Sequence, residues 1–305
     1  MSDSAHSDRS DPLGLRGVVP PTITAFDADG NLDPEQTAAH ARYVVDGGAH
    51  GVFPLGTNGE GPLLTPDERE SVVDAVVDAV GDDVPVIAGV GAPATRQAVA
   101  NAERAVATGA DGVVGVTPYY YPLDDAAAVA HYERLTDAVD VPVYVYHIPG
   151  RTGNHLSLDA WEAIAALDGI AGLKDSSKDV PWLGQAMARA PDATYLVGSD
   201  SLLEAGFGLG ADGAVSAVAN VFPELVVDCY EAHSAGDDAA VRDVQRRVYT
   251  IRDAIKTGPY MAGVKTALDI LDVPVDPGPL RAPLRTMGED DRAALADRLA
   301  ALGLR

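Results

Sequence analysis

The chain has a single cysteine, Cys229, and this scarcity excludes an internal disulfide framework and a zinc cluster built on cysteines. Residues 225–227 just before it are the apolar run Leu-Val-Val. We therefore predict that Cys229 packs in the core of a helix and has no catalytic part.

Long apolar runs are also lacking. No apolar stretch approaches the ~20 residues that a membrane-spanning helix requires. The first residues are rich in serine and aspartate and contain no apolar signal core. We therefore expect a cytoplasmic protein with no membrane partner, and we expect residues 1–14 to form a disordered acidic tail.

Positive charge is scarce, and lysine above all. The formal net charge is −24 at pH 7, and the lysines are Lys174, Lys178, Lys256 and Lys265. Such a surface repels nucleic acid and anionic membranes, so no nucleic-acid partner is expected. An acidic, lysine-poor surface resembles that of halophilic proteins, in which concentrated salt screens the self-repulsion.

What the chain does contain is a regular alternation of short apolar runs and longer amphipathic segments. The expected strands are residues 17–23, 51–55, 85–89, 112–117, 142–146, 170–174, 194–198 and 213–217. Their spacing is that of repeated β-loop-α units. This predicts an α/β fold, a (β/α)₈ TIM barrel over residues 15–233, with an open doubly wound sheet as the alternative. From Pro223 to Leu302 the pattern is helical, and we expect residues 234–305 to form a C-terminal helical extension.

Helix starts and turns carry their own signals. Asp33-Pro34 and Thr65-Pro66 each place a capping side chain before a proline, with Gln or Glu three residues after the cap, which predicts two capping boxes.

A Gly-Ala-X-Gly pattern begins at Gly48, Gly109 and Gly210, where we expect a helix to end and a strand to begin. Residues 208–213 match GxGxxG, but they follow a helix and enter a strand. The match is therefore interpreted as a turn and not as a dinucleotide site.

In a parallel barrel, reactive groups lie at the carboxyl ends of the strands. Lys174 ends the sixth expected strand. Partial burial there would lower the pKa of its amine and make it nucleophilic, so that it attacks a keto carbon. The alternative is a lysine that is merely paired with an acid at the rim.

Tyr146 ends the fifth expected strand and His147 follows it. Neighbouring strands are ~4.8 Å apart, so Tyr146 and Lys174 are expected to meet above the barrel, where the phenol relays protons. Tyr146 is otherwise a cover for the core. We also include His147 among the substrate-binding candidates, while no second ligand at suitable spacing supports a metal there.

The second expected strand runs into GTNGEG at residues 56–61. Its glycines permit tight turns that leave amide groups free, and Thr57 and Asn58 add donors. Thr57, Asn58 and Gly59 are therefore candidates for holding a carboxylate, although an ordinary turn is the simpler alternative. After the fourth strand, Tyr119 and Tyr120 belong to a tyrosine run of which at least one member is expected to line the site or a subunit contact.

Taken together, GTNGEG, TPYYYP at residues 117–122, YHIPGRTG at 146–153 and GLKD at 172–175 resemble the dihydrodipicolinate synthase and N-acetylneuraminate lyase superfamily. The resemblance covers nearly the whole chain from Gly17 onward. It implies a TIM barrel, usually a homotetramer, that acts on a 2-keto acid and an aldehyde with no metal or other cofactor.

The resemblance also implies roles for single residues. Lys174 matches the Schiff-base lysine, Tyr146 the proton-shuttling tyrosine, and Thr57 the relay threonine. Tyr120 matches a tyrosine that reaches across a dimer interface, and Val215 a position whose backbone carbonyl lies near the substrate. Asn58 stands where the family usually has Thr or Ser, which puts the details of substrate binding in question.

The members of this superfamily differ in the partner of pyruvate. Arg151 matches an arginine that binds the aldehyde's carboxylate in dihydrodipicolinate synthases. By contrast, GTNGEG and GSD at residues 198–200 are closer to aldolases of 2-keto-3-deoxy sugar acids. An arginine that binds phosphate in some aldolases is replaced by Leu123. We favour a 2-keto-3-deoxygluconate aldolase that gives pyruvate and glyceraldehyde, with the synthase as the alternative and a keto-deoxy acid dehydratase as a third possibility.

Two other classes of function are weighed against the aldolase. Glu60, His147 and Asp200 all lie near expected strand ends, as the ligands of a metal-dependent barrel enzyme would. A non-catalytic ligand-binding barrel is the other alternative, but binding alone needs no activated amine.

Overall fold

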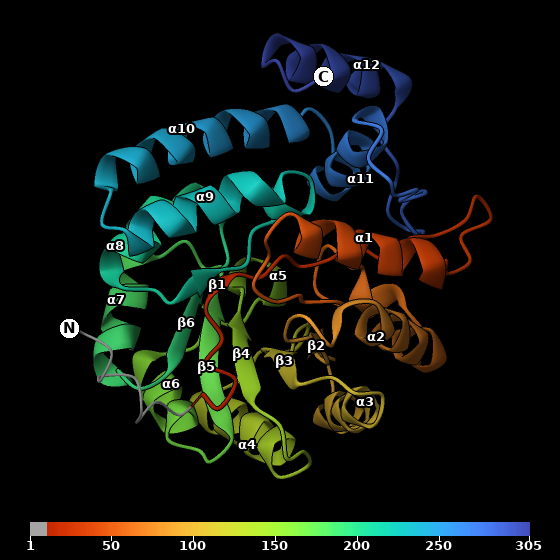
Figure 1. The fold of residues 1–305 in the computed structure, drawn as a ribbon. Helices are drawn as coiled ribbons and strands as arrows, with labels where there is room; N and C mark the ends of the chain where they lie inside the picture. The colour runs from red at the N-terminus through yellow and green to blue at the C-terminus, as the bar shows by residue number, and fades with distance from the viewer. Residues whose placement is uncertain (1–10) are drawn as a thin grey trace.

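A computed structural model describes residues 11–305 and has a curled, fully parallel sheet at its centre (Figure 1). Seven strands are hydrogen-bonded in the order β1-β7-β6-β5-β4-β3-β2. They are β1 (Gly17–Val18), β2 (Ile87–Gly89), β3 (Gly112–Val116), β4 (Val143–His147), β5 (Ile170–Asp175), β6 (Thr194–Val197) and β7 (Gly213–Ala214).

The sheet is closed into a barrel by residues 51–55, which were predicted as a strand. The backbone N–H of Phe53 donates to the carbonyl of Pro20 just after β1 (2.9 Å). On the other side, the N–H of Val52 donates to the carbonyl of Pro85 just before β2 (3.0 Å). The segment therefore fills the gap between the two outer strands, although its pairing is a single bridge and not a regular ladder. The predicted TIM barrel is confirmed.

Helices cover the outside of the barrel and follow the strands in the expected alternation (Figure 1). They are α1 (Pro34–Asp46), α2 (Pro66–Val80), α3 (Thr95–Ala107), α4 (Asp125–Thr136), α5 (Pro149–Thr152), α6 (Leu158–Ala165), α7 (Val180–Arg189), α8 (Leu203–Leu209) and α9 (Pro223–Ser234). Short 3₁₀ turns are η1 (Gly61–Leu63), η2 (Asp200–Leu202) and η3 (Val218–Asn220).

The predicted helix starts are correct, but only one of the two capping boxes is complete. Thr65 and Glu68 satisfy each other's backbone groups at the start of α2. Asp33 caps α1 by accepting from the N–H of Gln36. The side chain of Gln36 does not return this bond, because its oxygen accepts from the N–H of Asp276 instead.

The repeated glycines behave as predicted. Gly48, Gly109 and Gly210 have φ angles of 91°, 102° and 98°, a left-handed conformation that glycine adopts without steric cost. Gly210 lies between α8 and β7, so the GxGxxG match at residues 208–213 is a turn from a helix into a strand.

Side chains at alternate positions of the strands point into the barrel and fill its interior. They form a floor beneath the carboxyl end of the barrel. This inner cluster consists of Leu15, Val19, Phe53, Ile87, Val114, Tyr144, Tyr146, Ala171, Leu196 and Val215. A larger apolar layer lies between the strands and the helices. The barrel therefore presents a floor and not a channel, and its open end is the carboxyl end.

The amino-terminal end of the barrel is closed by Asp11. Its buried carboxylate accepts hydrogen bonds from the hydroxyls of Tyr144 (2.8 Å) and Thr194 (2.9 Å) and from the N–H of Leu15 (2.9 Å). Residues 1–10 of the expected tail lie outside the described residues. Residues 11–14 differ from the expected disorder, because the carboxylate of Asp11 anchors them to the barrel.

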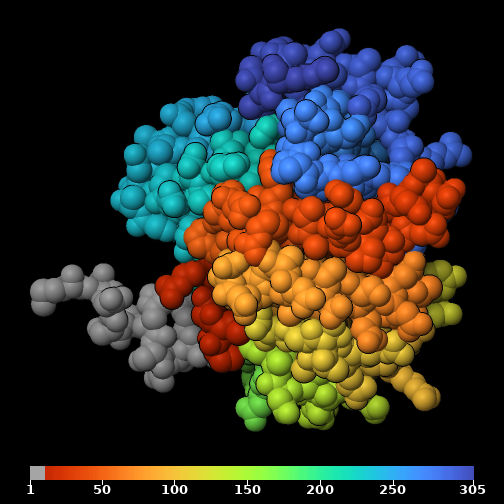
Figure 2. All heavy atoms as spheres, turned by 45° about the vertical axis from the view of Figure 1, so that its right-hand side comes forward, coloured from red at the N-terminus to blue at the C-terminus, as the bar shows by residue number. Residues whose placement is uncertain are grey.

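The predicted helical extension is α10 (Asp238–Ile255), α11 (Tyr260–Ile270) and α12 (Glu289–Ala301). These helices are stacked at one end of the molecule in Figure 1, and in Figure 2 α12 is the outermost of them, separated from α1 by blue residues that precede it in the chain. Cys229 is buried in α9, as predicted, and burial raises the pKa of its thiol to about 11. Within residues 11–305, no helix is long and apolar enough to cross a bilayer.

Candidate active site

The register of β4 and β5 places Tyr146 directly opposite Lys174. The two strands are parallel neighbours, as their order in the chain predicts for a barrel, and both residues stand at the carboxyl end. Tyr146 is 5% exposed and Lys174 is 4% exposed. The structure thus brings the two main candidates together in a buried position.

The ammonium of Lys174 lies against aromatic surface. Its Nζ is 3.7 Å from the centroid of the Tyr146 ring and 4.8 Å from that of Phe53. Burial lowers the pKa of Lys174, because the charged form loses its hydration, and the charges of Tyr146 and Asp200 only partly oppose this. A lowered pKa increases the share of neutral amine, which is the nucleophilic form.

The phenol of Tyr146 faces a second hydroxyl. Its oxygen lies 3.4 Å from Oγ1 of Thr57. Burial would raise the pKa of Tyr146, but the charge of Lys174 and hydrogen bonds with Thr57 and Ser176 outweigh burial and lower it. Thr57, Tyr146 and Lys174 therefore form a continuous polar path along which a proton can move.

These groups open into a pocket of about 410 Å³ at the carboxyl end of the barrel. A pocket of this size suits a small substrate of several carbons. Its wall is formed by Pro21, Thr57, Asn58, Tyr146, Ile148, Gly150, Arg151, Lys174, Ser176, Lys178, Gly198, Ser199, Asp200, Val215, Ala217, Arg252 and Tyr260.

Asn58 is the strongest candidate for a carboxylate donor in this wall. The residue is only 7% exposed, yet its Nδ2 has no hydrogen-bond partner among residues 11–305. A buried amide donor without a partner costs free energy, about 1–3 kcal/mol. A ligand oxygen in the pocket would remove that cost.

Most of the charged residues in the pocket wall are cationic. Arg151, Lys178 and Arg252 line the pocket, and Asp200 is the only acid in the wall. The carboxylate of Asp200 is already engaged, since it accepts from the hydroxyls of Ser216 (2.6 Å) and Tyr260 (2.5 Å). In a chain with a net charge of −24, this local excess of positive charge favours an anionic substrate.

Two expected binding residues do not reach the pocket. His147 is fully buried behind β4, where its Nδ1 lies 2.9 Å from Oδ1 of Asp175 and its Nε2 accepts from the N–H of Leu156. Gly59 packs against backbone, and its carbonyl accepts from the hydroxyl of Thr24. His147 lies away from the pocket because side chains alternate along a strand. The residue after Tyr146 therefore points to the opposite face of the sheet.

Val215 and the tyrosines have different positions. Val215 lines the main pocket at the end of the barrel floor. Tyr119 lines an adjoining, mostly apolar pocket of about 290 Å³ that shares Thr57 and Tyr146 with the first. Tyr120 is 82% exposed and has a φ of 82°, so within one chain it does not contribute to the site.

Several residues of the wall were not recognised from the sequence, among them Arg252, Tyr260 and Ser176. Arg252 and Tyr260 come from α10 and α11, and no strand-end rule indicates residues of a helical extension. Ser176 follows Lys174 by two residues, and side chains at this spacing along a strand share a face. The sequence could therefore have indicated that Ser176 lies beside Lys174.

The three residues weighed as metal ligands are not grouped. Glu60 is paired with Lys265, His147 with Asp175, and Asp200 with the hydroxyls described above. In the described part of the chain, no three His, Cys, Asp or Glu side chains are arranged to hold a metal ion.

Comparison with known proteins agrees with this geometry. The profile of the Dihydrodipicolinate synthetase family matches residues 14–302. An uncharacterized DapA-like lyase of Halobacterium salinarum is 65% identical over 96% of both chains. A 4-hydroxy-tetrahydrodipicolinate synthase of Natronomonas pharaonis is 35% identical over 94% of this chain and 97% of its own. Among solved structures, YagE of E. coli K12, a member of the dihydrodipicolinic acid synthase family in complex with pyruvate, superposes with a TM-score of 0.91 at 31% identity, covering 95% of this chain and 99% of that one.

Proposed function

The chain belongs to the dihydrodipicolinate synthetase family and is a lyase of that family, and from this premise we propose that Lys174 forms a Schiff base with pyruvate in a class I aldolase. The proposed reaction is the cleavage of 2-keto-3-deoxygluconate, or a close relative, to pyruvate and glyceraldehyde. The protein would need no metal or other cofactor for it.

The observation that carries the proposal is the position of Lys174. Its amine is buried at the end of β5, lies against the ring of Tyr146 and opens into a pocket that also contains the unpartnered amide of Asn58. A keto acid whose carboxylate accepts from Asn58 presents its carbonyl carbon to a neutral amine. YagE, which shares the fold, was solved with pyruvate bound.

In the first step, the neutral amine of Lys174 attacks C2 of the sugar acid and the resulting carbinolamine loses water. Tyr146 donates a proton to the departing hydroxyl, and Thr57 hands a proton on along the 3.4 Å contact between their oxygens. The product is an iminium ion, whose positive charge draws electrons from the neighbouring carbon.

In the second step, Tyr146 takes the proton of the C4 hydroxyl and the C3–C4 bond breaks. The electron pair of that bond moves into the enamine and glyceraldehyde leaves. A proton is then added at C3, and water hydrolyses the iminium to release pyruvate and restore the amine of Lys174. Every atom of the substrate is accounted for in the two products.

A second candidate is a 4-hydroxy-tetrahydrodipicolinate synthase, which would condense pyruvate with aspartate semialdehyde. Arg151 favours it, because this exposed cation lines the pocket and is free to meet a second carboxylate. The Natronomonas relative with that name supports the same alternative.

One preparation distinguishes the two. Purified protein in molar KCl is assayed for pyruvate release from 2-keto-3-deoxygluconate and for condensation of pyruvate with aspartate semialdehyde. The proposal expects kcat/KM to be at least about 100-fold higher with the sugar acid, a difference of about 2.7 kcal/mol in transition-state binding. The reverse ratio would establish the synthase.

We also propose a homotetramer in a salt-adapted cytoplasm. Tyr120 is held in a left-handed conformation at the surface and stacks edge-on against Tyr121, with their ring centroids 4.9 Å apart. Two exposed aromatic rings of this kind are costly in water and suit a subunit contact. Light scattering in molar KCl would test the assembly, with Tyr120→Ser expected to weaken it.

A further inference from the structure

The loop that carries Thr57 and Asn58 is held in an unusual backbone conformation. Glu60, two residues beyond Asn58, has a φ of 53°, in the left-handed region. For a residue other than glycine this costs about 1–2 kcal/mol. Some contact of Glu60 must offset that cost. Glu60 is the last residue of the loop at residues 57–60 that carries Thr57 and Asn58.

The side chain of Glu60 makes a fully buried ion pair. Nζ of Lys265 in α11 lies 2.9 Å from Oε1 of Glu60, and the two side chains are 4% and 0% exposed. Lys265 also donates to the carbonyl of Pro279 (2.8 Å), and its Nζ lies 4.6 Å from the ring centroid of Phe26. Such a pair is a poor source of net stability, because taking two charges out of water costs about as much as their attraction returns.

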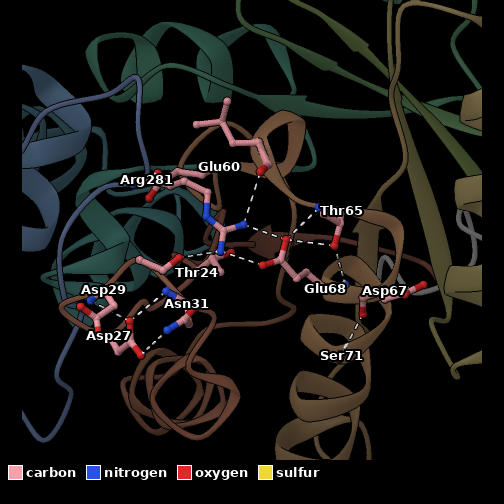
Figure 3. Close-up of polar contacts among 12 residues, drawn as sticks. Thr24, Asp27, Asp29, Asn31, Glu60, Thr65, Asp67, Glu68, Ser71 and Arg281 are labelled. Atoms are coloured by element: carbon pink, nitrogen blue, oxygen red, sulfur yellow. Dashed lines mark hydrogen bonds and ion pairs between the residues drawn. The ribbon is translucent and has the colours of Figure 1, made fainter.

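A second tie comes from the segment between α11 and α12. The backbone N–H of Arg281 donates to Oε2 of Glu60 (2.9 Å). The guanidinium of Arg281 binds both carboxylate oxygens of Glu68 at 2.7 Å, at the start of α2 (Figure 3). Both oxygens of Glu60 are therefore held by the C-terminal extension, whereas Glu68 is held by the same extension without touching the loop.

We propose that Lys265 and Glu60 are positioning residues, which fix the loop so that Thr57 and Asn58 face the keto acid above Lys174. This rests on the proposed function. The extension thereby takes part in substrate capture from the outside of the barrel. The extension fixes the orientation of residues 57–60. A buried ion pair specifies such an orientation, whereas an apolar contact does not.

The ion pair of Arg281 with Glu68 and that of Lys265 with Glu60 connect the extension to different parts of the barrel. Arg281 and Glu68 are 17% and 25% exposed and connect the extension to α2. Lys265 and Glu60 connect it to residues 57–60. Loss of either pair loosens the extension, but only loss of the second releases the donors for the substrate's carboxylate. This contrast supplies a matched control.

The test uses the full chain in molar KCl. Pyruvate is varied, the Lys174 adduct is trapped with borohydride, and intact mass gives the pyruvate concentration for half-maximal trapping. Lys265→Met and Glu60→Gln are expected to raise that concentration about tenfold, since a misplacement of about 1 Å can cost up to 100-fold. Glu68→Gln is expected to leave it within about twofold. Circular dichroism establishes that each variant is folded.

If Lys265→Met does not fold, the result for Glu60→Gln alone tests the positioning role. Burial lowers the pKa of Lys265, so its amine can give up its proton when the partner charge is removed. The positioning role would be overturned if Glu60→Gln had the wild-type pyruvate concentration for half-maximal trapping. It would also be overturned if Glu68→Gln raised that concentration as much as Glu60→Gln does. Either result would leave the Schiff base in place. A wild-type protein that forms no adduct would overturn the proposed function and this role together.

Discussion

Nζ of Lys174 lies 3.7 Å from the centroid of the Tyr146 ring, and the two residues are direct partners in the register of neighbouring strands. This contact brings a phenol that can move protons close to the amine, whose pKa burial lowers. It also places the two groups where a strand end opens into the pocket. The predictions below follow from this pair and from the fold that holds it.

Tyr146→Phe removes the proton-transferring hydroxyl and keeps the ring beside Lys174. We expect kcat to fall by about 10²–10⁴-fold, the usual range for general acid–base catalysis, with the fold intact. Steady-state cleavage assays measure this. Tyr195→Phe is the control, because its hydroxyl is bonded to the carbonyl of Ala186 far from the pocket, and it should leave kcat unchanged. A loss below about tenfold in Tyr146→Phe would remove Tyr146 from the relay.

The pH dependence follows from the direction of the Lys174 shift. Imine formation needs the neutral amine, so its rate rises as pH rises through the folded pKa of Lys174. Because burial lowers that pKa below the ordinary 10.5, the rise should be complete at a lower pH than for a free lysine. Initial trapping rates between pH 6 and 10 test this. A rate that still rises tenfold per pH unit up to pH 10, as for a free lysine, would contradict it.

The pairing of Lys174 with Tyr146 could be predicted from the sequence, because strand order and carboxyl-end position follow from periodicity. The placement of His147 could not be predicted by proximity alone. It is next to Tyr146 in the chain, but alternation directs it behind the strand to Asp175.

Arg252 and Tyr260 lay beyond strand-based reasoning. They reach the pocket only through the packing of α10 and α11, which no local pattern encodes. The same holds for the Glu60–Lys265 pair, because nothing local in the sequence connects the two residues. Residues 51–55 were predicted as the second strand, and the structure has a single bridge there in place of a ladder.

Asp11→Ala tests the anchor at the amino-terminal end of the barrel. The change leaves the hydroxyls of Tyr144 and Thr194 without their acceptor, so we expect a loss of about 2–4 kcal/mol in the free energy of unfolding. Urea unfolding in constant salt measures it, with the exposed Asp82→Ala as the control. A loss equal to that of the control would show that Asp11 is a passive part of the tail. Activity of the folded variant should be unchanged, because Asp11 lies at the end opposite the pocket.

The net charge of −24 predicts a salt requirement. Screening shortens the reach of surface repulsion from about 10 Å at 0.1 M salt to about 3 Å at 1 M. We expect the urea midpoint to rise steadily between 0.1 and 2 M KCl. An unchanged or falling midpoint would mean that the acidic surface does not limit stability.

The most direct test of the Schiff base is trapping on the wild-type protein beside Lys174→Arg. Both are incubated with pyruvate and borohydride in molar KCl and analysed by intact mass and peptide mapping. We predict one pyruvate-derived adduct on Lys174 in the wild type, none in folded Lys174→Arg, and no turnover by that variant. An unmodified wild type, or an adduct on Lys178 or Lys256 that persists in Lys174→Arg, would contradict the assignment.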